Sequence, residues 1–330
     1  MKKFFVCFAA ILCLFTSCKS GKTLLPNVSG KAGEVIVVME KADWEGALGV
    51  AVRELLASDC PYLAQKEPLY SLVSVTPSAF GDLLKIHRNI LFFSIDPQGV
   101  QSGVKHQRDV WATPQCVVSV RAADSKSALE LVGENGGAIL SAIEQAERDR
   151  VIRNSILFEE KSLGPAVTEE FGGALHFPIG YKLKKKTSDF VWVADEKQYT
   201  MQGVFVYKYP FDGSENPFEA EQIISHRNEI LKANVPGLFE NTWMTTGIII
   251  PPTVEFIKYQ GQTFAQTRGY WEVENDFMGG PFVSHSFYSK DGKDIIVLEA
   301  FVYAPKFDKR QYLRQVESIL FSWEWKETEK

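Results

Sequence analysis

The chain of 330 residues has little cysteine and little histidine. Three of its five cysteines, Cys7, Cys13 and Cys18, lie within the first 18 residues, so only Cys60 and Cys116 could serve the body of the protein as thiols. The five histidines never occur as a spaced pair, so a zinc site would have to be assembled entirely by folding. We therefore expect no metal and no cofactor.

The chain also lacks an excess of basic charge, because 36 Lys and Arg face 41 Asp and Glu and the formal net charge at pH 7 is -5. A general nucleic-acid partner would need a basic patch, but the one cationic cluster, YKLKKKTSD at 181–189, is short and directly precedes an aromatic strand. A solvated hairpin end explains this cluster, and contact with an anionic lipid or glycan is the alternative. We therefore expect no nucleic acid among the partners.

The longest apolar run, FFVCFAAILCLF at 4–15, is shorter than the ~20 apolar residues that cross a bilayer. Two lysines precede this run and small residues follow it, an order typical of a secretion signal. The segment TSC at 16–18 resembles the lipobox recognised by the bacterial lipoprotein signal peptidase, although Phe15 replaces the preferred Leu. We therefore expect residues 1–17 to be a signal peptide and Cys18 to become the lipidated first residue of the mature chain.

Cleavage at this point would remove Cys7 and Cys13 and leave two thiols besides the lipidated one. An oxidising envelope would permit a disulfide between Cys60 and Cys116. Separation along the sequence says nothing about distance in space, so the sequence leaves this bond open.

The body of the chain predicts two parts that differ in their strand pattern. Residues 18–33 are rich in Lys, Gly, Ser, Asn and Pro and predict a flexible tether. Residues 34–174 alternate short apolar strands with helices, and a long helix from Asp124 to about Ile156 is expected to kink or break at its paired glycines. These features predict a mixed α/β part.

Residues 175–330 contain consecutive strands with many aromatic side chains, which predict an antiparallel sheet packed with helices. Asp308 and Gln311 resemble a capping box at the start of the last helix. Two segments run from an aromatic strand into an amphipathic helix, so recurring β-β-α units are a further hypothesis. The fold class is therefore α+β, and the two parts could form one continuous domain because no Pro/Gly/Ser-rich linker separates them.

Four segments together resemble a known family: the lipobox, GKAGEVIVV, RGYWEVENDFMGGPFVSHSF and FVYAPKFDKRQYLRQVESIL. Over nearly the whole mature chain, the sequence is similar to the Gram-negative envelope lipoproteins, typical of Bacteroidota, called domain of unknown function DUF4837. The resemblance implies an envelope location but supplies no reaction, ligand or catalytic residue. Because Lys19 follows Cys18 without the acidic run of surface-export signals, we expect an outer-membrane lipoprotein that faces the periplasm.

Candidate binding residues lie on the strand RGYWEVEND. Arg268, Tyr270 and Glu272 share one strand face because successive side chains alternate. A half-buried strand with a charged outer face would explain this pattern. The functional alternative is a recognition surface on which Tyr and Arg contact a glycan, a peptide or a partner protein.

His285 and Glu299 complete the candidate binding residues, and together with Glu272 they are the groups that a catalytic interpretation would use, although the sequence assigns no catalytic residue. His285 lies on an apolar strand face, so a packed histidine is the simpler interpretation and a general base is the alternative. Glu272 and Glu299 could form a glycosidase pair only if the fold sets their separation. We therefore expect a non-catalytic binding or structural protein, held to the membrane through Cys18, with an envelope hydrolase as the alternative.

Overall fold

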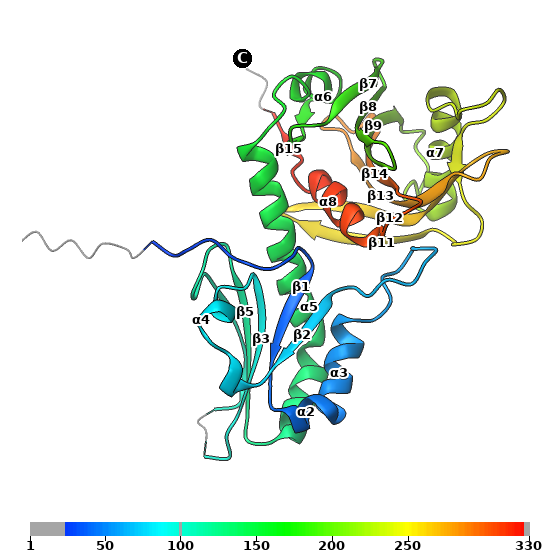
Figure 1. Ribbon diagram of the computed structural model, residues 1–330. Helices are drawn as coiled ribbons and strands as arrows, with labels where there is room; N and C mark the ends of the chain where they lie inside the picture. Colours follow the sequence, from blue (N-terminus) through cyan, green and yellow to red (C-terminus); the bar gives the residue numbers. More distant parts are fainter. Residues whose placement is uncertain (1–23, 99–100, 327–330) are drawn as a thin grey trace, which may run out of the picture.

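The computed structural model describes residues 24–98 and 101–326. Cys18 and the expected signal peptide lie outside the described residues. Within the described ranges, the chain forms a five-stranded sheet followed by an eight-stranded sheet, with helices packed on both (Figure 1). This arrangement confirms the α+β class predicted from the sequence. In these ranges, no helix has the length and apolar character needed to cross a membrane.

The N-terminal sheet has the strand order β2-β1-β3-β5-β4. Its strands are β1 (Glu34–Val38), β2 (Ser71–Val75), β3 (Asn89–Ile95), β4 (Gly103–Arg108) and β5 (Cys116–Ala122). Strand β4 pairs antiparallel at one edge, and the other pairings are parallel. The nearly continuous apolar letters of β1 and β3 are typical of strands buried on both faces of a parallel sheet.

One face of this sheet is covered by α3 (Ala47–Leu56), which follows the short α2 (Lys41–Glu45), and by α5 (Ser125–Leu157). Among the described residues, the other face carries a 3-10 turn, η1 (Pro77–Ala79), the four-residue α4 (Asp82–Lys85), and the side chains of Val110 and Trp111. The expected break in α5 does not occur, because the helix is continuous through its glycines. A Cβ on Gly136 would lie 3.2 Å from Leu55, so this glycine allows α3 and α5 to approach closely.

The C-terminal sheet is antiparallel and has the order β10-β12-β13-β14-β9-β8-β7, with β11 also paired to β12. Its strands are β7 (Lys182–Lys186), β8 (Phe190–Lys197), β9 (Thr200–Pro210), β10 (Met244–Thr246), β11 (Thr253–Tyr259), β12 (Gln262–Val273), β13 (Gly279–Tyr288) and β14 (Asp294–Tyr303). A two-stranded pair, β6 (Gly173–Ala174) with β15 (Glu324–Trp325), lies beside it.

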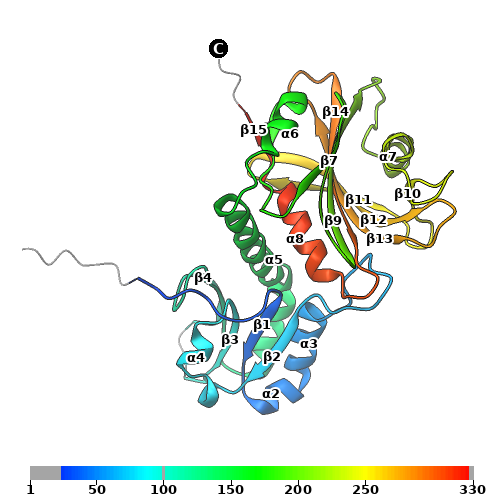
Figure 2. The same ribbon diagram turned by 45° about the horizontal axis from the view of Figure 1, so that its top comes forward.

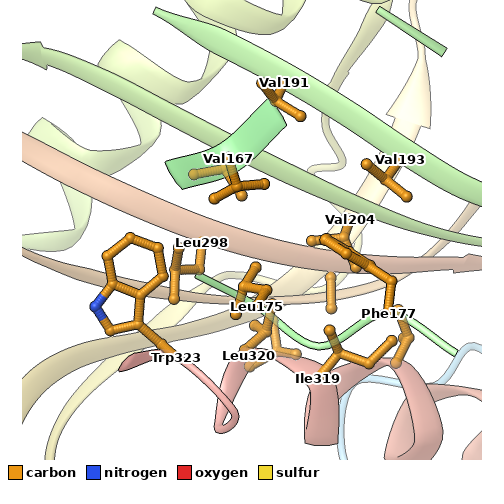
Figure 3. Close-up of a cluster of buried hydrophobic side chains, with 14 of the residues drawn as sticks. Val167, Leu175, Phe177, Val191, Val193, Val204, Leu298, Ile319, Leu320 and Trp323 are labelled. Carbon is orange, nitrogen blue, oxygen red and sulfur yellow. The ribbon is translucent and has the colours of Figure 1, made fainter. Parts of the chain in front are cut away.

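Helices cover both faces of this second sheet (Figure 2). One face packs on α6 (Gly164–Phe171) and α8 (Arg310–Leu320), and the other face packs on α7 (Ala220–Asn234). Figure 3 shows the core of the first face, where Trp323, Leu298 and Val204 lie among the buried side chains. The hypothesised β-β-α units both occur, but α7 and α8 cover opposite faces, so the two units are not arranged alike.

Helix α6 corrects the expected boundary at residue 174. Val167 and Phe171 belong to the core of the C-terminal sheet, so α6 packs with the second part although it precedes residue 175. The sequence boundary at residue 174 follows the strand pattern, whereas α6 joins this core through apolar side chains on a helix.

The end of the expected tether also differs from the prediction. Residues 26–29 hydrogen-bond to the N-terminal half, where the amide of Ser29 donates to the carbonyl of Ile86 (2.8 Å) and the amide of Thr113 donates to the carbonyl of Pro26 (2.8 Å). Backbone pairing of this kind does not depend on side-chain periodicity, which explains why the sequence pattern did not reveal it.

The halves of the molecule contact each other through α5 and through the loop that contains Glu67. Helix α5 extends from the N-terminal half and packs against α8 (Figure 1). The buried carboxylate of Glu67 accepts hydrogen bonds from the backbone amides of Lys309 (2.7 Å) and Arg310 (2.8 Å) at the start of α8. The capping box expected from Asp308 is therefore replaced by a carboxylate from the other half, and Lys309 has no side-chain cap of its own.

Candidate functional site

Several hollows mark the surface of the described chain. A large cleft of about 790 Å³ lies between the end of α5, α8 and the β8–β9 strands. A hollow of about 660 Å³ lies on the face of the N-terminal sheet opposite α3 and α5. A third, of about 260 Å³, lies where α5, β12 and α8 meet, and we call it the arginine pocket. Its charged lining residues are Arg148, Arg268, Arg310, Arg314, Glu144 and Glu317.

Both halves of the molecule build the arginine pocket. Helix α5 supplies Glu144 and Arg148 from two successive turns. Helix α8 supplies Arg310, Arg314 and Glu317, which lie on one face of the helix at spacings of four and three residues. Strand β12 supplies the remaining guanidinium, so one pocket draws its charges from three elements.

Arg268 is paired with Glu317. Its Nη1 donates to Oε2 of Glu317 at 3.3 Å, and Nη2 donates to Oε1 of the same carboxylate. Burial opposes ionisation of Glu317, but Arg268 beside it holds the pKa of this carboxyl below its usual value. The Nε atom of Arg268 donates to Oε1 of Gln266 at 3.0 Å, which fixes the plane of the guanidinium.

The other three guanidinium groups have no carboxylate within ion-pair distance among the described residues. Arg314 donates to the carbonyl of Leu69 (3.0 Å), Arg310 donates to the carbonyl of Pro68, and Arg148 lies 3.6 Å from the ring centre of Phe321. These contacts hold the side chains in place and leave their charge uncompensated. Burial and the neighbouring Arg314 both lower the pKa of Arg310.

The second carboxylate of the pocket, Glu144, has no hydrogen-bond or ion-pair partner within the described chain. Burial raises its pKa, and the nearby Glu317 raises it further. The pocket therefore contains four guanidinium groups against two carboxylates, one of which is biased toward its neutral form. Such an arrangement favours an anionic ligand, because guanidinium forks match carboxylate and phosphate oxygens in pairs.

The large cleft differs because its buried charges are already paired. Arg88 donates to Oε2 of Glu147 at 3.0 Å, and Arg150 donates to Oε1 of the same carboxylate at 2.9 Å. At the rim, Lys197 lies 2.8 Å from Asp195. Charges that neutralise one another inside the protein leave less attraction for a ligand, so the arginine pocket is the stronger candidate.

The two thiols of the described chain are free. Cys60 lines the arginine pocket, whereas Cys116 is buried at the start of β5, where its thiol lies 3.7 Å from the carbonyl of Ala142. The disulfide that the sequence left open is therefore not formed. Burial raises the pKa of each thiol to about 11, so both are protonated at neutral pH and poor nucleophiles.

His285 is fully buried on the α8 face of β13, between the rings of Phe264 and Phe321. Burial lowers its pKa to about 3. Because Oε1 of Gln266 accepts from Arg268, Nε2 of Gln266 donates to Nε2 of His285 at 3.0 Å. The histidine proton is thus assigned to Nδ1. His285 is a packed histidine that supports the orientation of Arg268 through Gln266.

Glu299 lies on the opposite, α7 face of the sheet. Its carboxylate accepts from Nε of Arg227 at 2.9 Å and from Nη2 at 2.7 Å, and both side chains are fully buried. Arg227 also lies 4.0 Å from the ring centre of Phe282 and donates to Oγ1 of Thr246 at 2.8 Å. The sequence held a signal for this pair, because Arg227 lies within the apolar stripe of a helix.

The sheet separates the candidate catalytic residues from one another. Glu272 shares the α8 face with Arg268, so Glu299 and Glu272 point to opposite faces and form no glycosidase pair. Tyr270 and Glu272 are half-buried farther along β12 and do not line the arginine pocket. Of the expected recognition surface, only Arg268 lies in the pocket. Among the described residues, no cluster of His, Cys, Asp and Glu could hold a metal ion.

Comparison with known proteins divides the chain into two regions. Residues 28–155 match the family model described as Domain of unknown function (DUF8532), and residues 160–322 match Domain of unknown function (DUF4837). The DUF4837 resemblance therefore covers the C-terminal half and not nearly the whole mature chain, because the GKAGEVIVV segment falls in the DUF8532 region. The division also agrees with the packing of α6 on the second sheet.

No curated protein matches the chain. Among solved structures, a crystal structure from Bacteroides thetaiotaomicron VPI-5482 is similar, with 8% identity and a TM-score of 0.27. The match covers 47% of this chain and 46% of that chain, so the two share less than half of their lengths. Through residues 160–322, the chain belongs to the DUF4837 family, a domain of unknown function.

Proposed function

We propose that the protein is a lipid-anchored envelope protein that binds a small anionic ligand in the arginine pocket without catalysing a reaction. The observation that carries this proposal is the excess of guanidinium groups over carboxylates in a pocket built by both halves. Only Arg268 is neutralised by a direct ion pair among the four arginines. A carboxylate or phosphate group would offset the remaining charge.

Preorganisation supports the same proposal. Arg310 and Arg314 are held by the backbone carbonyls of Pro68 and Leu69, and Arg148 is held against an aromatic ring. Guanidinium groups that are already oriented lose less conformational entropy when a ligand binds. The volume of about 260 Å³ suits a small ligand rather than a folded partner.

The anchor rests on the first 18 residues of the sequence. A positive segment, an apolar run and a lipobox-like TSC support lipidation of Cys18, export, and retention at the outer membrane on the periplasmic side. Mass spectrometry of the mature amino terminus is expected to find a diacylated or triacylated Cys18. Cys18→Ala is expected to release the protein from membranes, and an unmodified terminus at another residue would refute the anchor.

Isothermal titration tests the ligand site. The mature protein in detergent is titrated with inorganic phosphate, sulfate and citrate at constant ionic strength. Arg148→Gln and Arg310→Gln are each expected to weaken binding by about 10- to 100-fold, because a charge-assisted hydrogen bond contributes about 1.5–3 kcal/mol. The matched control is Arg153→Gln, which removes the same charge from an exposed site on α5 at the rim of the large cleft.

Arg153→Gln is expected to bind the anions as the wild type does. If the control loses affinity while the pocket variants keep it, the anion binds in the large cleft and the proposal is wrong. If none of the three anions binds the wild type, the arginine pocket is not an anion site.

A further inference from the structure

The hollow on the face of the N-terminal sheet opposite α3 and α5, which we call the outer-face hollow, combines aromatic walls with a polar floor. Phe80, Phe92 and Trp111 form its walls, and Ser94 and Ser119 lie on its floor. Its volume of about 660 Å³ falls within the usual range of ligand pockets, about 300–1,000 Å³. This hollow lies apart from the arginine pocket and shares no lining residue with it.

The aromatic rings meet at steep angles. The ring centres of Phe80 and Phe92 are 5.7 Å apart with a 58° angle between planes, and those of Phe80 and Trp111 are 5.8 Å apart with a 72° angle. Rings at such angles are tilted or meet edge to face and do not stack flat on one another. All three side chains are half-buried, so apolar ring surface remains available to a ligand.

The floor is built by two neighbouring parallel strands. Ser119 of β5 lies beside Phe92 of β3, and Arg121 lies beside Ser94, all on the same face of the sheet. Gln107 of the edge strand β4 adds an amide. Within the described chain, the side chains of these two serines, Arg121 and Gln107 make no hydrogen bond, so their donors and acceptors can turn to a ligand.

Charge in the hollow is nearly balanced. Lys85 is paired with Asp82 at 2.9 Å, and the charge of Arg121 is opposed by Asp96 on the lining. A strongly anionic ligand would therefore gain little here. A wholly apolar ligand would remove water from the hydroxyl and amide groups of the floor without replacing their hydrogen bonds, which is costly.

We propose that the outer-face hollow binds a saccharide ring. A pyranose has an apolar face of C–H groups that can pack on Trp111 and Phe80, and a rim of hydroxyl groups that can hydrogen-bond to Ser94, Ser119 and Gln107. This ligand uses both the aromatic walls and the polar floor. The site is independent of the anion site, so either proposal can fail without the other.

Saturation-transfer NMR with the mature protein in detergent tests this inference, using the neutral saccharides maltotriose and chitotriose as probes. At least one probe is expected to bind. Trp111→Ala is expected to weaken binding at least tenfold, and Ser119→Ala, which removes one hydroxyl at little risk to folding, is expected to weaken it several-fold. Ser74→Ala, on the exposed strand β2 of the same sheet, is the matched control and is expected to change nothing.

Two results would overturn the inference. One is the absence of binding by both saccharides to the wild type. The other is unchanged binding in both Ser119→Ala and Trp111→Ala, which would locate any saccharide elsewhere. A tryptophan variant that fails to fold leaves the serine variant and its control to decide.

Discussion

Arg227 with Glu299 and Arg268 with Glu317 pair on opposite faces of the same antiparallel sheet. The first pair lies under α7, is fully buried, and finds its other partners in Thr246 and the ring of Phe282. The second pair lies beside α8 and opens onto a pocket with three further guanidinium groups.

The difference between these surroundings separates a structural role from a binding role. Within the buried Arg227–Glu299 pair, each charge is matched by the other, so no ligand is needed to balance it. In the arginine pocket, the ion pair accounts for one guanidinium only, and the remaining positive charge is held in place by carbonyls and a ring. The same two residue types therefore stabilise the fold on one face and leave binding capacity on the other.

Breaking the buried Arg227–Glu299 pair is expected to have the largest effect on stability. Arg227→Met leaves Glu299 as an uncompensated buried charge, and we expect the free energy of unfolding to fall by about 3–5 kcal/mol. Urea denaturation measures this loss. The double variant Arg227→Met with Glu299→Met is expected to recover much of it, because no buried charge remains. A loss below about 1 kcal/mol in the single variant would contradict the structural role.

Removing the hydrogen bonds between Glu67 and the start of α8, which link the two halves, is expected to reduce stability by less. Glu67→Ala leaves two backbone amides at the start of α8 without their acceptor, and we expect a loss of about 2 kcal/mol. Phosphate binding should weaken as well, because the same turn of α8 positions Arg310. The exposed Glu54→Ala on α3 is the control, and equal effects of the two substitutions would show that the link is unimportant.

This link also shows what the sequence could and could not predict. Alternating and continuous apolar patterns were enough for the α+β class, because burial of strand faces is a local signal. The cap of α8 comes from Glu67, whose partners are 242 and 243 residues away, and no local pattern records such a contact. The sequence instead suggested Asp308, which has the right spacing and no cap role.

The arginine pocket was partly visible in the sequence. The alternation of a strand indicates Arg268, and the spacing of Arg310, Arg314 and Glu317 on one helix face is a second signal in the sequence. Their convergence with Glu144 of α5 requires the packing of two helices from different halves. Catalytic interpretations of His285 failed for a similar reason, since only the fold shows its complete burial.

The pH dependence of stability tests whether His285 is buried in its neutral form on the α8 face of the sheet. Burial lowers its pKa to about 3 from the ordinary 6.5, so below pH 6.5 the unfolded chain takes up a proton that the folded chain does not. Stability therefore falls as pH is lowered, and this residue accounts for a loss of about 2 kcal/mol between pH 7 and pH 5.

His285→Gln keeps a hydrogen-bonding side chain and is expected to remove that part of the pH dependence. Urea denaturation of the wild type and the variant at pH 7 and pH 5 measures it. The same slope in both proteins would mean that His285 is not buried in its neutral form.

Neutralising Glu317, the carboxylate paired with Arg268, is expected to have the smallest effect on stability. Glu317→Gln should cost about 1 kcal/mol, because the Arg268–Glu317 pair is partly accessible to solvent. The same variant should bind phosphate about fivefold more tightly, since it removes a negative charge worth ~1 kcal/mol of repulsion. Glu134→Gln, exposed on α5, is the control. Weaker phosphate binding in Glu317→Gln than in this control would reverse the predicted sign.

A crystal structure of the mature protein soaked in sodium selenate tests the central claim most directly. Selenate has the charge and shape of sulfate, and its selenium is located by anomalous scattering. We expect a selenium peak within hydrogen-bond distance of the guanidinium groups of Arg310 and Arg314, and its loss in crystals of the Arg310→Gln/Arg314→Gln variant. An empty arginine pocket in crystals that bind selenate elsewhere, or a peak that persists in the double variant, would contradict the account.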